Sequence, residues 1–186
     1  MKLFFFLSVA LATTNIEPYI IGQDIPFDCI QRNIDTGEHI FEQNKIVYGP
    51  PPKCLESSKP LTFKYGIEQD FNCTITITDE LYHLFQLYLH EDVPFSCRIP
   101  LSSEHMSIEK GGTSIPFTFN LRGSLSDSHL DIDPNLNVLF TPFQNSFVSA
   151  IAYSSSLNTT RVVIGDKLTL HFASRWNLHK NIKECT

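Results

Sequence analysis

The segment that decides the fold class begins with Leu61-Thr62-Phe63-Lys64-Tyr65-Gly66-Ile67 and continues with Phe71-Asn72-Cys73-Thr74-Ile75-Thr76-Ile77. Large apolar residues occupy odd positions in both stretches, and mostly polar residues occupy the even ones. The same parity returns in Phe95-Ser96-Cys97-Arg98-Ile99. Because side chains alternate between the two faces of a β-strand, residues 61–99 are predicted to contain strands with one buried face.

Alternating or short apolar stretches bounded by turn residues recur along the rest of the chain. They predict an all-β fold, a single antiparallel β-sandwich (immunoglobulin-like or similar) with about ten short strands and at most one short helix. The pair Gly165-Asp166 predicts a tight hairpin turn that joins the last two strands. The strands expected outside residues 61–99 cover 28–34, 38–41, 46–48, 115–122, 129–132, 136–140, 147–153, 161–164 and 167–176.

One segment, residues 79–89, fits two structures. Leu81, Leu84, Phe85 and Tyr88 have helical spacing, and Asp79 precedes them as a possible cap. Phe85, Leu87 and Leu89 also alternate with polar or amphipathic residues. Because strands are expected on both sides, we favour a turn followed by a strand.

The N-terminus has the pattern of a secretory signal peptide. A positive Lys2 precedes an apolar run over residues 3–12, which ends in the small-residue pattern Ala10-Leu11-Ala12. We expect cleavage after Ala12, so that residues 13–186 form one domain that is secreted or lies in the lumen of the secretory pathway. A run of this length is about half of what a membrane-spanning helix needs, and we expect no span elsewhere in this chain.

The overall composition is that of a globular domain. Of the 186 residues, 42% are hydrophobic and only 18% are charged, and the formal net charge is −6. There is no basic cluster, which argues against nucleic acid and anionic membrane surfaces as partners.

Five cysteines indicate an oxidising compartment. Similar spacings suggest the pairs Cys29–Cys54 and Cys73–Cys97, although the same four residues allow two other pairings. Cys185 is left over, so it pairs with another chain in a disulfide-linked dimer, stays free, or belongs to a sequence that stops short of its native terminus. No Cys-x-x-Cys spacing suggests a metal or a redox site.

Two sequons, Asn72-Cys73-Thr74 and Asn158-Thr159-Thr160, predict N-glycosylation. Asn158 lies in a turn rich in Ser and Thr, whereas Asn72 lies on the solvent face of a predicted strand. A disulfide at Cys73 would compete with glycan transfer to Asn72.

No motif indicates catalysis, a cofactor or a metal. Asp131, Asp133 and Asn135 resemble the start of a calcium loop, but the glycine and the terminal acidic residue of that loop are missing. Asp127 could join Asp131 and Asp133 in a looser site, although a turn explains them better. The chain has seven histidines but no His-Glu-x-x-His or Gly-x-Ser-x-Gly motif. We therefore expect a protein that is not an enzyme.

Three stretches, residues 34–40 (Ile-Asp-Thr-Gly-Glu-His-Ile), 66–74 (Gly-Ile-Glu-Gln-Asp-Phe-Asn-Cys-Thr) and 163–166 (Val-Ile-Gly-Asp), resemble those of uncharacterised fungal secretory-pathway proteins. The resemblance implies a luminal β-rich domain that precedes one C-terminal membrane span. This chain departs from that pattern, since it ends shortly after Trp176 without such a span.

These observations favour a non-catalytic secreted or luminal glycoprotein domain that acts in protein or glycan interaction. The first alternative is a carrier for a lipid or another apolar ligand between two sheets. A large internal cavity would favour the carrier, and a filled core with an exposed apolar surface would favour the interaction domain. The second alternative is a hydrolase with a dispersed catalytic triad.

Overall fold

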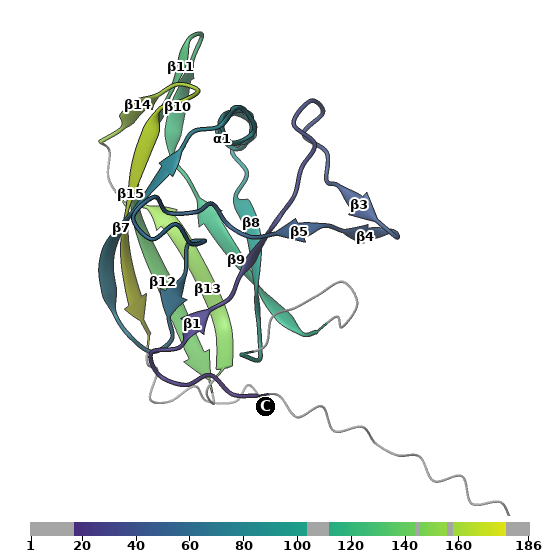
Figure 1. Ribbon diagram of the computed structural model, residues 1–186, viewed down its shortest axis with the longest axis vertical. Coiled ribbons are helices and arrows are strands. Elements are labelled where there is room, and N and C mark those ends of the chain that lie inside the picture. The colour runs from purple at the N-terminus through teal and green to yellow at the C-terminus, as the bar shows by residue number, and fades with distance from the viewer. Residues whose placement is uncertain (1–16, 104–111, 144–145, 156–157, 178–186) are drawn as a thin grey trace, which may run out of the picture.

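An eight-stranded sheet, curled into a half-barrel, forms the centre of the molecule (Figure 1). The computed structural model describes residues 17–103, 112–143, 146–155 and 158–177. In hydrogen-bonding order the strands are β5 (Tyr48–Gly49), β2 (Asp28–Ile30), β8 (Phe95–Pro100), β9 (Ser114–Asn120), β13 (Ser146–Ser154), β12 (Asn135–Phe143), β15 (Lys167–Trp176) and β7 (Gln69–Thr76).

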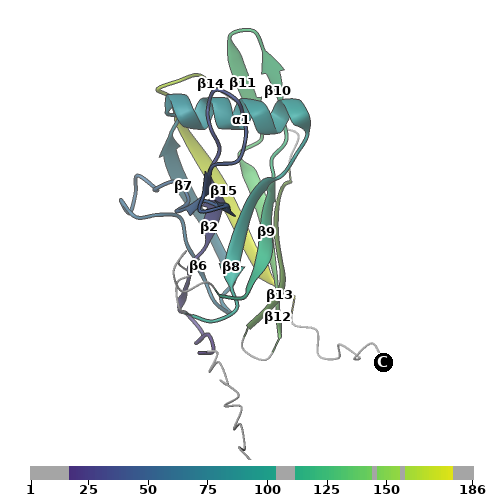
Figure 2. The same ribbon diagram turned by 90° about the vertical axis from the view of Figure 1, so that its right-hand side faces the viewer.

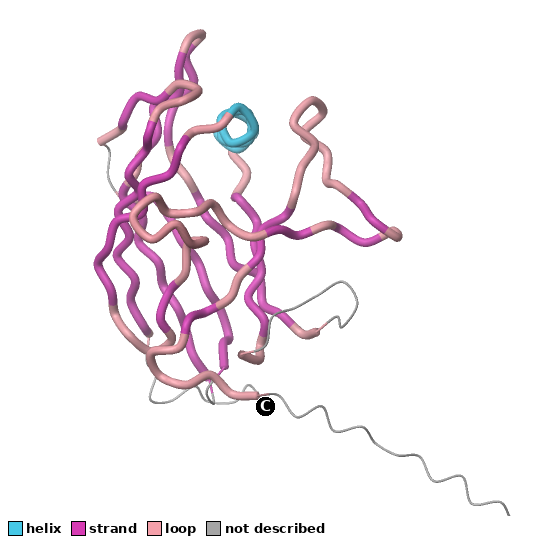
Figure 3. The backbone as a smooth tube through the Cα atoms, in the orientation of Figure 1, coloured by secondary structure: helices cyan, strands magenta, loops and turns pink. Residues whose placement is uncertain are grey.

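Three smaller sheets surround the central one (Figure 3). The pair β1 (Asp24–Ile25) and β6 (Phe63–Lys64) ties the N-terminal segment to the chain just before β7. The hairpin of β3 (Phe41–Glu42) and β4 (Lys45–Ile46) joins the ends of the strands expected over 38–41 and 46–48, and it stands away from the body in Figure 1. The third sheet contains β10 (Gly123–Ser126), β11 (His129–Ile132) and β14 (Thr160–Val162).

The all-β prediction is confirmed in its coarse form, but the expectation of purely antiparallel pairing is wrong. β12 runs parallel to β15, and β13 runs parallel to β9, so the central sheet is mixed. Alternation shows which face of a strand is buried but not which strand lies beside it, and parallel and antiparallel strands that are half buried share the same period.

The predicted hairpin of the last two strands is also wrong. Gly165 adopts a positive φ of 93° and the Asp166 N–H donates to the Val163 carbonyl, so the turn itself is present. However, β14 pairs with β11 and β15 pairs with β12 and β7. The turn therefore moves the chain from the small sheet to the large one.

Residues 79–91 form a helix, α1 (Asp79–Glu91), where we favoured a strand. The Thr78 hydroxyl caps its first turn by accepting a hydrogen bond from the Leu81 N–H at 3.2 Å, and Asp92 ends it in the left-handed conformation. Phe85 and Tyr88 are buried, so the helical spacing was the correct signal. We favoured a strand because strands were expected on both sides. The structure of flanking segments does not determine that of the segment between them.

The core lies on the concave side of the half-barrel and is rich in aromatic side chains. Phe63 is 1% exposed, and its ring centroid lies 5.4–6.0 Å from those of five other phenylalanines. The strict alternation of burial along β15 confirms the predicted parity of that strand. The five partners of Phe63 are Phe27, Phe71, Phe117, Phe140 and Phe172.

Candidate functional site

An open groove of about 990 Å³ lies between α1 and the loop of residues 31–37. Figures 1 and 2 show that loop beside the helix. Leu84 and Leu87 of α1 form part of one wall, and Ile34 forms part of the other. Pro52 and Leu55 line the groove where the proline-rich segment runs past it.

The loop wall is held in place by its own hydrogen bonds. The Asn33 N–H donates to the Glu38 carbonyl at 2.8 Å, and the Gly37 N–H donates to the Asn33 carbonyl at 2.8 Å. The Asn33 Oδ1 accepts from the backbone N–H groups of Asp35 and Thr36. This internal bonding gives the wall a defined shape before any ligand binds.

Arg32 and Gly37 connect the loop to the helix. Arg32 Nε donates to the Tyr88 hydroxyl at 3.1 Å, and its Nη1 donates to the Gly37 carbonyl at 2.8 Å. Burial raises the pKa of Tyr88, against a smaller opposing effect of Arg32, so the phenol stays neutral and accepts this bond. A Cβ added to Gly37 would lie 3.2 Å from Leu87, which shows how closely the two walls approach here.

The lining of the groove is mostly aliphatic and polar, and its aromatic side chains are Phe95, His83 and His90. Ile34 is 39% exposed, Ile40 39% and Leu55 46%, which is unusual for large aliphatic side chains that lie near one another in a concavity. Charged groups of both signs, among them Arg32, Lys53 and Glu80, surround these side chains, so the groove has no single-signed character. Such a lining suits a segment with aliphatic side chains better than a sugar ring, which stacks on aromatic faces.

The interior of the half-barrel has little free space. An apolar cavity of about 40 Å³ lies between α1 and the concave face of the sheet, lined by Phe85 of the helix and by Leu136 and Phe172 of the sheet. Ligand pockets usually have volumes of about 300 Å³ or more. The described core is thus packed, and the carrier hypothesis gains no support from it.

Ser128, His129 and Asp131 form a short hydrogen-bonded series at the β10–β11 hairpin. Ser128 Oγ lies 3.1 Å from His129 Nδ1, and His129 Nε2 lies 3.2 Å from Asp131 Oδ2. These are the residue types of a hydrolase triad. Their closeness in the sequence, within residues 128–131, was the only signal that could have indicated this series. Neither the groove nor the internal cavity is lined by any of the three.

Two of the three acidic residues considered for calcium, Asp131 and Asp133, have partners of their own. Asp131 also lies 3.9 Å from Arg161, and the Asp133 carboxylate accepts from the backbone and side-chain N–H groups of Asn135. Among the described residues no group of three or more His, Cys, Asp or Glu side chains is placed to hold a metal ion.

The disulfides pair differently from our first suggestion. Cys29 bonds Cys97, its direct neighbour across the β2–β8 ladder, and Cys54 bonds Cys73. Similar spacing along the chain was a poor guide, because pairing depends on which Cβ atoms the sheet brings together. Both disulfides fit an oxidising compartment.

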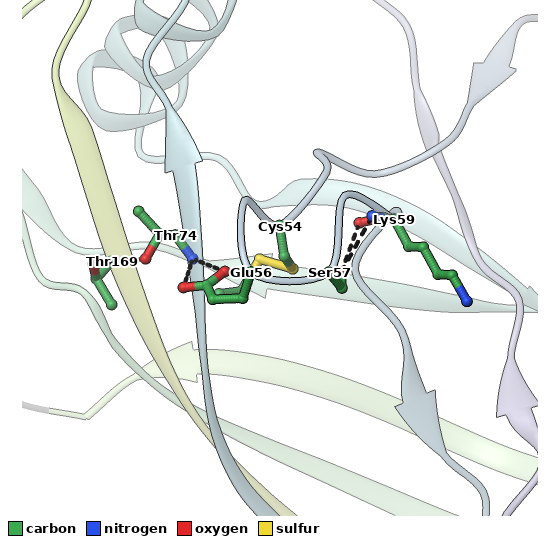
Figure 4. Close-up of a disulfide and its surroundings, with 7 residues drawn as sticks. Cys54, Glu56, Ser57, Lys59, Thr74 and Thr169 are labelled. Carbon is green, nitrogen blue, oxygen red and sulfur yellow. Dashed lines mark hydrogen bonds between the residues drawn. A yellow bond between two sulfur atoms is a disulfide. The ribbon is translucent and has the colours of Figure 1, made fainter.

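The Cys54–Cys73 disulfide holds a loop against β7, the last strand of the central sheet (Figure 4). The Glu56 carboxylate accepts from the Thr74 N–H at 2.9 and 3.0 Å, and the Leu55 N–H donates to the Thr74 carbonyl. Backbone groups that would otherwise be free at the edge of the sheet are therefore bonded.

Both predicted glycosylation residues are exposed, Asn72 on β7 and Asn158 just before β14. His171 lies on the same solvent face as Asn72. The signal peptide predicted over residues 1–12 and the leftover Cys185 lie outside the described residues. None of the described helices is long and apolar enough to cross a bilayer.

The groove itself was missed by the sequence analysis, because α1 was expected to be a strand. A signal was present, since Thr78 precedes two acidic residues and an apolar stripe with helical spacing, which is typical of a helix start.

Comparison with known proteins gives one match. A family model described as "Domain of unknown function (DUF8773)" matches residues 14–185. No curated protein and no solved structure matches the chain.

Proposed function

The chain belongs to the DUF8773 family, a domain of unknown function, and we propose that it is a non-catalytic secreted or luminal domain that binds a segment of a partner protein in the groove beside α1. The observation that carries the proposal is the combination of a groove of about 990 Å³, with half-exposed aliphatic side chains on both walls, and a core whose cavity is only about 40 Å³. Buried apolar area is the main source of affinity in such sites.

The occupant we favour is an extended peptide segment with aliphatic side chains. The groove is open to solvent, so a segment of another chain can enter it, and its lining offers polar side chains such as Gln31, Asn33 and Gln86 for backbone hydrogen bonds. Its mixed charges place no strong demand on the charge of the segment. The compartment is proposed from the two disulfides and from the N-terminal pattern.

Panning a library of random linear peptides against the folded protein tests this function. Bound peptides are expected to be rich in aliphatic residues and to lose about tenfold in affinity, about 1.4 kcal/mol, when Leu87→Glu places a charge on the groove wall. The matched control is Ile151→Glu, which puts the same charge on the opposite, convex face of β13, where Ile151 is exposed.

Two results would contradict the proposal. The first is a set of selected peptides that bind the Leu87→Glu and Ile151→Glu variants equally well. The second is the failure of any peptide to bind the wild-type protein. Circular dichroism of both variants shows whether the fold is retained.

A further inference from the structure

The sequon Asn72-Cys73-Thr74 is split between the two faces of β7. Cys73 points inward, is fully buried and forms the disulfide with Cys54. Asn72 is exposed on the outer face, and Thr74 shares that face. A glycan on Asn72 and the disulfide at Cys73 therefore fit together in the final fold, since they leave the strand in opposite directions.

Every part of the sequon is engaged in the folded protein. Asn72 Oδ1 is hydrogen-bonded to His171 Nδ1 at 2.8 Å, and the hydroxyls of Thr74 and Thr169 are hydrogen-bonded at 2.9 Å (Figure 4 shows both threonines). The Thr74 backbone is bonded on both its N–H and its carbonyl by the loop that Cys54 anchors. An enzyme that must grip the Asn amide and the Thr hydroxyl of a pliable chain would have to break these hydrogen bonds and free the strand from the sheet.

We propose that Asn72 is N-glycosylated only while Cys54 and Cys73 are still thiols, so that its occupancy records a competition between glycan transfer and disulfide closure. In the first reaction the Asn72 amide nitrogen bonds to C1 of an oligosaccharide carried on a polyprenyl diphosphate. The C1–O bond breaks, the lipid diphosphate leaves, and the amide nitrogen loses one proton. In the second, the two thiols lose two electrons and two protons to the disulfide of a thiol oxidant, which is reduced to a dithiol.

The chain makes this a close competition. Cys54 and Cys73 are only 19 residues apart, so both enter the oxidising compartment at nearly the same time as Asn72. Closure of the loop branches the backbone at the middle residue of the sequon and prevents it from entering an enzyme cleft as a single chain. The other disulfide, Cys29–Cys97, spans 68 residues and has neither cysteine inside a sequon.

Asn158 provides an internal reference. Asn158, Thr159 and Thr160 are all exposed, and the first two lie outside the strands. Neither disulfide includes a residue of this sequon. Its occupancy should thus be independent of the cysteines and should report the overall activity of the transferase in the same cell.

The experiment expresses the full chain in a eukaryotic secretory host and measures occupancy of both sites in total cellular protein. Deglycosylation in ¹⁸O-water followed by peptide mass spectrometry marks each used asparagine. Wild type is expected to be partly occupied at Asn72, and Cys54→Ser, which leaves the sequon intact, is expected to at least double the ratio of Asn72 to Asn158 occupancy. The matched control, Cys29→Ser, removes the other disulfide and is expected to leave the ratio unchanged.

Measuring total cellular protein keeps the test valid if a variant folds poorly or is retained. An unchanged ratio in Cys54→Ser overturns the proposal. An equal rise of the ratio in Cys29→Ser also overturns it, because that would point to slow folding in general. So does a wild-type occupancy at Asn72 that is either complete or absent and that does not change in Cys54→Ser.

Discussion

The approach of Gly37 to α1 predicts the effect of replacing this glycine by alanine. Gly37 has a φ of +71°, a conformation that costs an L-residue about 1–2 kcal/mol. The new Cβ would also lie 3.2 and 3.3 Å from the two δ-carbons of Leu87, which is tighter than ordinary van der Waals contact, so that side chain must shift at a cost of about 1 kcal/mol. Gly37→Ala is therefore expected to lower the free energy of unfolding by about 2–3 kcal/mol.

Gly165→Ala separates these two contributions. Gly165 also has a positive φ, of 93°, but a Cβ added there would meet nothing within 4 Å. This control carries the backbone cost alone, so it should destabilise by about 1 kcal/mol less than Gly37→Ala. Urea denaturation followed by circular dichroism measures both values, and at this chain length each kcal/mol corresponds to a shift of about 2–4 °C in Tm.

A double-mutant cycle with Leu87→Ala completes the argument. In that background the δ-carbons that the new Cβ meets are gone, so Gly37→Ala should cost about 1 kcal/mol less than it does in the wild type. Gly165→Ala and Leu87→Ala should instead be additive. If Gly37→Ala and Leu87→Ala proved additive as well, the loop would not rest on the helix as the structure shows, and the groove wall would be wrongly placed.

Three further predictions concern the core, the sheet edge and the Ser128 series. Phe63→Ala should lower the free energy of unfolding by about 3–5 kcal/mol, because it empties the centre of the aromatic cluster. The control Phe41→Ala, at a side chain that is 60% exposed, should change it little. Equal effects of the two variants in urea denaturation would contradict this assignment of the core. Hydrogen bonding from the Thr74 side chain, and next from its backbone N–H, lowers the pKa of Glu56 in the folded state. The carboxylate therefore stabilises the fold at pH values above its unfolded pKa. This contribution is lost as the pH falls through the lower, folded pKa. Glu56→Gln should therefore destabilise at neutral pH, and its difference from wild type in urea denaturation should shrink as the pH falls below the ordinary glutamate range, about 4.3; a difference that is independent of pH would refute the role of the charge. Ser128 should not react with a fluorophosphonate probe, because it lines neither the groove beside α1 nor the internal cavity. Labelling that disappears in both Ser128→Ala and His129→Ala would instead establish a nucleophile there.

Local patterns predicted the strands well where one face is buried. The alternation over residues 71–76 and 167–176 corresponds to β7 and β15, and the solvent face assigned to Asn72 is observed. The turn at residues 165–166 also lies where the pair Gly165-Asp166 predicted one. These features depend on side chains close together in sequence, so the sequence contains the information needed to find them.

The groove and the disulfide pairing depended on contacts that the sequence does not display. Residues 31–37 meet α1 through Arg32 and Tyr88, which are 56 residues apart, and Cys29 meets Cys97 across a separation of 68. Residues 79–89 fit both the helical and the strand period. The helix forms because Thr78 caps its first turn and because Phe85 is buried on its inner face. Local propensities differ by less than such tertiary contacts contribute.

The sequence by itself determined that this protein is rich in β-strands, which face of β7 and of β15 is buried, and which asparagines carry sequons. Only the tertiary structure decided that the central sheet is mixed, that Cys54 bonds Cys73, and that a helix and a loop enclose a groove. The physical reason is one of range. Strand period arises from backbone geometry within a few residues, whereas strand order, disulfide pairing and concave surfaces follow from the packing of segments far apart in the chain, which minimises exposed apolar area for the molecule as a whole.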